Sequence, residues 1–161
     1  MPTTGTSSWL VDTTVGTVTV VSTTQEGQPV VGITLREGFR YGPRISFELG
    51  QRIGGPSAGL VFALAIYDKI TPGELLGGRH VAGTGSINPA GDVGGIGAIQ
   101  EKIAGAEDAG ATVFLVPAPN CADLDGVRTD MTLVKVGTLR DAIAALETLQ
   151  QPDGADRVPR C

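Results

Sequence analysis

The sequence is poor in the side chains on which common metal and redox sites depend. Its 161 residues include a single histidine, His80, and two cysteines, Cys121 and Cys161. The cysteines are far apart and do not form a CxxC pair, which excludes zinc fingers and thioredoxin-like motifs. A single histidine excludes HExxH metalloproteases, whose motif needs two. Because Cys161 ends a polar tail, we expect no structural disulfide, and Cys121 is interpreted as a small packing residue. We expect neither a metal nor a cofactor.

Lysine and net positive charge are also scarce. None of the three lysines, at positions 69, 102 and 135, follows a glycine, which excludes a Walker A loop. The net charge is -5, with 12 basic and 17 acidic residues, and this argues against a nucleic-acid partner. No apolar run approaches the roughly 18 residues that span a bilayer. The N-terminus lacks the features of a signal peptide, since its first basic residue is Arg36. We expect a soluble chain or an excised fragment of a longer one.

The length corresponds to one domain of layered α+β (α/β) type with a mixed sheet. We interpret residues 1–12 as a leader or linker remnant, 13–149 as the domain, and 150–161 as a polar, disordered tail. The helix at 57–69 is apolar nearly all round, so we expect it at the centre of the domain. Hydrophobic patterns and turn residues predict strands at 13–24, 30–35, 44–49, 112–116 and 132–136, a hairpin of 80–87 with 92–96, and helices at 57–69, 98–109 and 139–149.

Ser57 is the first candidate for catalysis. It follows a glycine-rich loop and opens the apolar helix, with Pro56 suited to the first helical position and Gly55 to the cap. The serine hydroxyl is then left without a capping role. The free backbone N–H groups of Gly55, Ser57 and Ala58 could form an oxyanion hole. The alternative is that serine is simply common near helix starts.

Lys102 is the second candidate. It lies within a stripe of small and apolar residues on the predicted helix 98–109, whereas Glu101 and Asp108 lie on the opposite side. Such a lysine either extends its ammonium to the edge of the stripe or is desolvated. Desolvation lowers the pKa of an ammonium, as a lysine general base requires. A serine activated by lysine is a known substitute for Ser–His, and we interpret His80 as structural.

Two segments together resemble the proteolytic domain of Lon proteases. They are GGPSAGLVFALAIYD, starting at Gly54, and AGTGSINPAGDVGGIGAIQEKIAGAEDAGATVFLVPAPN. The resemblance covers about Gly54 to Leu149 and is closest to the bacterial Lon-like subgroup in which a PDZ domain and a membrane anchor precede this domain. It departs from classical Lon at Gly54, where a D-G-P-S sequence has an acidic residue.

The resemblance implies a serine endopeptidase with the fold of the second domain of ribosomal protein S5. The nucleophile would be Ser57, the base Lys102, and Thr84 in Gly83–Ser86 would support the dyad. It further implies unfolded or flexible protein substrates, a homo-oligomer such as a hexameric ring, and a membrane-tethered, extracytoplasmic location. The PDZ domain, the anchor and the ATPase domain of the family are absent from this sequence.

Two other functions remain as alternatives. Gly94–Gly97 before a helix could cradle phosphate in a nucleotide-binding module, although Gln100 stands where a dinucleotide motif has glycine. A catalytically silent scaffold or RNA-binding relative with the S5-like fold is the second. The acidic balance argues against RNA, and the presence of both Ser57 and Lys102 argues against a silent domain.

Overall fold

The computed structural model describes residues 4–11, 14–30, 45–46 and 55–161. The chain forms two compact units, 1–44 and 45–161. The strands expected at 30–35 and 44–49 lie almost entirely outside the described residues. The domain boundaries at 13 and 149 stay a prediction.

The first unit consists of two antiparallel pairs of strands. β1 (Thr4–Val11) pairs with β2 (Thr14–Val21), and β3 (Thr23–Gln25) pairs with β4 (Gln28–Val30). The predicted strand at 13–24 thus corresponds to β2 and β3. Residues 4–11, which belong to the segment interpreted from the sequence as a leader or linker remnant, form the strand β1. The backbone of these residues pairs with β2 along its whole length, which the local composition does not reveal.

The second unit alternates helices and strands. In chain order it contains η1 (Pro56–Ala58), α1 (Gly59–Ile70), β5 (Val81–Gly83), β6 (Ser86–Ile87), β7 (Val93–Gly94), α2 (Ile99–Asp108), β8 (Val113–Pro117), η2 (Ala118–Leu124), β9 (Thr132–Val136), α3 (Leu139–Leu149) and α4 (Gly154–Arg157). The hairpin predicted for 80–87 with 92–96 is present in shorter form, because Ser86–Ile87 pairs with Val93–Gly94 whereas Val81–Gly83 pairs in parallel with β8. The predicted helices and the last two strands are confirmed to within about two residues. So is the layered α+β class.

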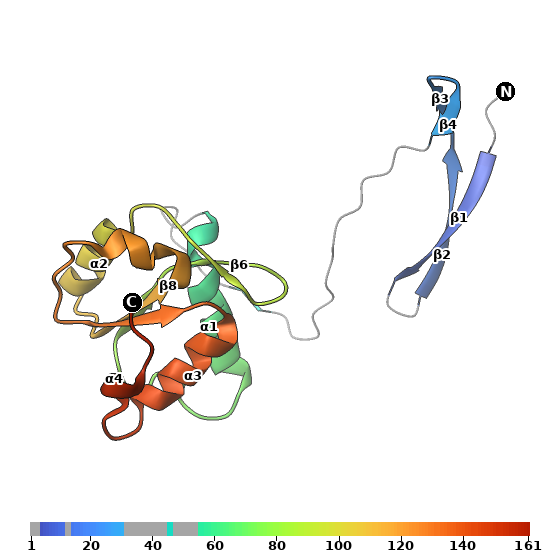
Figure 1. The fold of residues 1–161 in the computed structure, drawn as a ribbon. Coiled ribbons are helices and arrows are strands. Elements are labelled where there is room, and N and C mark those ends of the chain that lie inside the picture. Colours follow the sequence, from blue (N-terminus) through green and yellow to red (C-terminus); the bar gives the residue numbers. More distant parts are fainter. Residues whose placement is uncertain (1–3, 12–13, 31–44, 47–54) are drawn as a thin grey trace. The chain divides into compact units, whose positions relative to one another are not determined.

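A parallel sheet in the order β5-β8-β9 forms the middle layer of this unit (Figure 1). The central strand β8 is buried on both faces, as its unbroken apolar sequence requires. Val113 and Leu115 belong to a core shared with α1 and α3, whereas Phe114 and Val116 belong to a core shared with α2. The helices therefore cover both faces of the sheet.

α1 is less enclosed than its apolar sequence predicts. Only Leu60 and Leu64 are buried, and the other apolar side chains of the helix are half-buried or, at Ile70, exposed. The helix contributes one buried row to the core rather than lying at its centre. Apolar composition alone does not distinguish a helix that is buried all round from one that is buried along a single row, because both consist of the same residue types.

α3 begins as its sequence predicts. The Thr138 hydroxyl accepts a hydrogen bond from Asp141 N (3.1 Å), and the Asp141 carboxylate accepts one from Thr138 N (2.9 Å). This reciprocal capping box satisfies two N–H groups that the helix leaves free, a contribution of about 1 kcal/mol. The four buried residues of α3 then pack into the core.

The C-terminal segment is ordered, so the prediction of a disordered tail is wrong. Residues 154–157 form α4, Val158 is 5% exposed within the core, and the Pro159 carbonyl accepts a hydrogen bond from Lys135 N (2.9 Å). Cys161 forms a disulfide with Cys121, against the expectation of no structural disulfide. Tertiary contacts hold this segment, and its local sequence, which is polar, does not show them.

Candidate active site

The backbone of Ser57 is fixed by the segment that follows β5. Ser57 lies in η1 at the entry to α1, and its carbonyl accepts hydrogen bonds from Gly85 N (2.8 Å) and from the Thr84 hydroxyl (2.9 Å). Thr84 is 3% exposed, so its hydroxyl needs this partner. Two donors on one carbonyl hold the serine turn against residues almost thirty positions later in the chain. Thr84 thus restrains the backbone of Ser57.

A close approach of two backbones reinforces this contact. Leu60 N donates to the Gly85 carbonyl (3.0 Å), so the first turn of α1 bonds to the same residue as Ser57. A Cβ at Gly59 would lie 3.1 Å from the Ile87 side chain and 3.2 Å from Ile87 N. Only glycine allows α1 to start this close to β6 without displacement. The close contact with Ile87 therefore explains why the PSAG segment ends in glycine, Gly59, and not in a residue with a side chain.

Gly55, Ser57 and Ala58, whose N–H groups are expected from the sequence to act as oxyanion donors, precede the N-terminus of α1. Gly55 has a φ of 85°, and Pro56–Ala58 form a 3₁₀ turn ahead of α1. Between described residues, no hydrogen bond outside the helices and strands uses the N–H of Gly55, Ser57 or Ala58. A helix N-terminus also carries a partial positive charge that favours a developing oxyanion. This geometry is compatible with acyl transfer at Ser57.

Lys102 lies in the second turn of α2, beside the buried residues Ile99 and Ile103. Its side chain is half-buried, and its ammonium donates a hydrogen bond to the Gly97 carbonyl (2.9 Å). Within the described part of the chain, the ammonium makes no hydrogen bond to Ser57 or to Thr84. The side chain therefore extends to the edge of the apolar row, which is the first of the two placements considered from the sequence.

α2 is held at both ends by side chains. Ahead of its first turn, the buried Asn120 amide hydrogen-bonds to both backbone groups of Ile96. At the other end, the Glu107 carboxylate accepts hydrogen bonds from the Thr129 hydroxyl (2.7 Å) and Asp130 N (3.0 Å). These two donors stabilise the carboxylate and lower the pKa of Glu107. The helix that carries Lys102 is thus fixed relative to β9 and η2.

The structure brings some predicted site residues together and leaves others apart. The Thr84 hydroxyl is hydrogen-bonded to the Ser57 carbonyl, and Gly55 and Ala58 lie within two residues of Ser57. Lys102 is hydrogen-bonded to the Gly97 carbonyl in the loop before α2. His80 is exposed, and its carbonyl accepts a hydrogen bond from Thr112 N (2.9 Å), next to β5 and β8. In the glycine loop 94–97, Ile96 N is occupied by Asn120 and is not free for a phosphate. Sequence reasoning assigned no role to Asn120.

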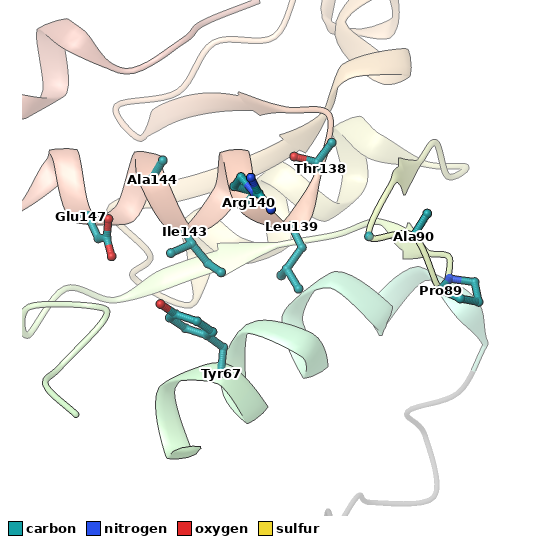
Figure 2. Close-up of a pocket in the computed structure, with 10 residues that line it drawn as sticks. Tyr67, Pro89, Ala90, Thr138, Leu139, Arg140, Ile143, Ala144 and Glu147 are labelled. Carbon is teal, nitrogen blue, oxygen red and sulfur yellow. The ribbon is translucent and has the colours of Figure 1, made fainter. Parts of the chain in front are cut away.

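A groove of about 840 Å³ lies between α1, α3 and the loop that joins β6 and β7. Figure 2 shows Tyr67 of α1 facing Ile143 of α3, with Pro89 and Ala90 at the far end. Neither Ser57 nor Lys102 lines it. The described residues contain no group of three or more possible metal ligands. Among the described helices, none combines the length and hydropathy that crossing a bilayer requires.

Comparison with known proteins identifies the family. Residues 52–148 match the model of the Lon protease (S16) C-terminal proteolytic domain, a segment that contains Ser57, Thr84 and Lys102. The chain is similar to Lon protease 2 of Syntrophobacter fumaroxidans (34% identity over 110 residues, 66% of this chain). It is also similar to Lon protease 1 of Sorangium cellulosum (39% over 94 residues, 56%) and to Lon protease 2 of Herpetosiphon aurantiacus (41% over 86 residues, 51%).

The family model covers more than half of the chain, so the chain belongs to the Lon proteolytic-domain family. The matched regions span only 14%, 11% and 10% of these three relatives. The likeness therefore concerns the proteolytic domain alone.

Proposed function

We propose that this domain is a serine endopeptidase in which Ser57 is the nucleophile and Lys102 the general base. The observation that carries the proposal is the double hydrogen bond from Thr84 and Gly85 to the Ser57 carbonyl, within a segment that matches the Lon proteolytic family. It holds the serine at a helix N-terminus with backbone N–H groups beside it. Backbone N–H groups beside the serine are one part of the arrangement that acyl transfer needs, and the general base is the other.

In the proposed reaction, neutral Lys102 takes the proton of the Ser57 hydroxyl as Oγ attacks a peptide carbonyl. The N–H groups of Gly55, Ser57 and Ala58 stabilise the oxyanion. Lys102 then gives that proton to the leaving amine, and the C–N bond breaks to leave an acyl-serine. A water molecule, deprotonated by Lys102, attacks the ester, and the proton returns to Ser57 as the acid product leaves.

For the reaction, the Lys102 ammonium must lose a proton and leave the Gly97 carbonyl for Ser57. The present bond to Gly97 favours a second candidate, a catalytically silent scaffold of the same fold. The substrates we propose are unfolded or flexible proteins. We also propose that the active form is a homo-oligomer.

The test is hydrolysis of casein without ATP by wild type and by Ser57→Ala. We expect Ser57→Ala to lower kcat by about 10⁴-fold or more, because it removes the nucleophile. Thr148→Ala is the matched control, since it removes a hydroxyl that bonds within α3, to the Ala144 carbonyl. Equal hydrolysis by wild type and Ser57→Ala would contradict the proposal. Absence of hydrolysis by a wild type of oligomeric mass would favour the silent scaffold.

A further inference from the structure

Asn120 is a buried polar residue that the proposed reaction does not use. Its side chain is 4% exposed and lies in η2, directly after the central strand β8. A buried amide is costly unless it is hydrogen-bonded, and Asn120 is fully engaged. Its Oδ1 accepts from Ile96 N (2.9 Å), and its Nδ2 donates to the Ile96 carbonyl (2.8 Å) and to Asp123 Oδ2 (2.8 Å).

These bonds fix the segment that receives the Lys102 ammonium. The amide contacts both backbone groups of Ile96, as a neighbouring strand would, and Gly97 follows immediately. The Gly97 carbonyl accepts the hydrogen bond from Lys102 Nζ (2.9 Å). Two hydrogen bonds to one residue restrain both its position and its orientation. The acceptor of Lys102 is therefore one residue away from a buried anchor.

The anchor depends on a close approach. A Cβ at Gly95 would lie 3.3 Å from Asn120 Oδ1 and 3.2 Å from Pro119 Cβ, so a side chain at this position would push the η2 loop away. By contrast, a Cβ at Gly105, on α2 itself, would meet nothing within 4 Å. The two glycines make a matched pair: one is required by the Asn120 contact and the other is not.

The start of α2 also needs restraint. Ala98, the residue between Gly97 and α2, has a φ of 56°, in the left-handed region that a residue with a Cβ seldom adopts. Such a conformation persists where the surrounding structure holds it. The Asn120 amide provides that restraint two residues earlier.

We propose that Asn120 is a positioning residue for Lys102, acting through Ile96 and Gly97 on the start of α2. The inference rests on the proposed function, because it assigns Asn120 to the placement of the general base. It concerns the geometry of the base and not the binding of substrate. Loss of the amide should therefore lower kcat and leave KM unchanged.

The experiment measures kcat and KM of Asn120→Ala with a fluorogenic peptide derived from a casein cleavage site. Misplacing a catalytic group by about 1 Å can cost 10²-fold, so we expect kcat to fall by about 10- to 100-fold with KM within about twofold of wild type. Asn120→Asp keeps the acceptor for Ile96 N but loses both donors and faces the Asp123 carboxylate, so we expect a comparable loss. Val136→Ala, in the core on the other side of the sheet, serves as a control for lost stability alone.

A second pair of variants keeps the test decisive if Asn120→Ala does not fold. Gly95→Ala keeps the Asn120 side chain but pushes it away from Ile96, so this variant should have a lower kcat. Gly105→Ala should not lower kcat. Wild-type kcat in a folded Asn120→Ala or Gly95→Ala variant would overturn the inference, as would an equal fall in Val136→Ala. Failure of the proposed function has a different signature, which is undiminished hydrolysis by Ser57→Ala.

Discussion

The two halves of the candidate active site are held in different ways. The serine half is fixed by the main chain, because Gly85 N, the Gly85 carbonyl and the close approach at Gly59 bind η1 and α1 to residues 84–87. The lysine half is held by side chains: Asn120 reaches the loop before α2 from η2, and Glu107 bonds the other end of α2 to Thr129 and Asp130. Backbone hydrogen bonds persist through most substitutions, whereas a side-chain hydrogen bond is lost when its residue is replaced. The serine should therefore keep its position through changes that displace the lysine.

The largest effect on this comparison is expected from the lysine itself. Lys102→Arg keeps the charge but removes a base, because arginine is not deprotonated in proteins, and we expect kcat to fall by about 10³-fold or more. Lys135→Arg is the matched control, since Lys135 is an exposed residue of β9. Steady-state hydrolysis of the same peptide measures both variants. Full activity in Lys102→Arg would show that Lys102 is not the general base.

The next effect concerns the anchor of η2. Cys121 follows Asn120 directly, and its disulfide with Cys161 closes a loop of 40 residues. The chain-entropy relation assigns such a loop about 4 kcal/mol, so Cys161→Ser should lower the free energy of unfolding by up to that amount. Denaturant unfolding of wild type with and without a dithiol reductant provides the check. The reductant should destabilise wild type and leave Cys161→Ser unchanged; an equal response of both would show that the disulfide does not contribute.

The smallest effect is expected on the serine half. Thr84→Val removes the hydroxyl bond to the Ser57 carbonyl but leaves the bond from Gly85 N, so we expect a loss of about 0.5–1.5 kcal/mol in unfolding free energy. The fall in kcat should be smaller than that of Asn120→Ala, and Thr84→Ser should restore both quantities. A greater loss of kcat in Thr84→Val than in Asn120→Ala would reverse the comparison between the two halves.

Local sequence patterns predicted most of the second unit. The apolar run of β8, the Thr138–Asp141 cap of α3 and the hairpin around Asn88–Gly91 are each encoded within a few residues, and the structure contains all three. The candidates Ser57 and Lys102 also stand out locally, as a glycine-rich helix start and as a lysine in an apolar stripe.

The remaining features depend on residues distant in sequence. The disulfide joins residues 40 positions apart, and the order of residues 154–161 arises from contacts with β9 and η2. Asn120 bonds to a backbone 24 positions earlier, and nothing in its own neighbourhood announces this partner. A polar residue three positions after a fully buried strand, immediately preceded by Pro119, is the one local signal that could have drawn attention to it.

The most direct test of the central claim is covalent labelling of the domain with a fluorophosphonate, which reacts with activated serines. The account predicts one adduct per chain, located at Ser57 by peptide mass, absent in Ser57→Ala and strongly slowed in Lys102→Arg but not in Lys135→Arg. No adduct in the folded wild type, an adduct on another serine, or equal labelling rates in Lys102→Arg and wild type would contradict a Ser57–Lys102 dyad.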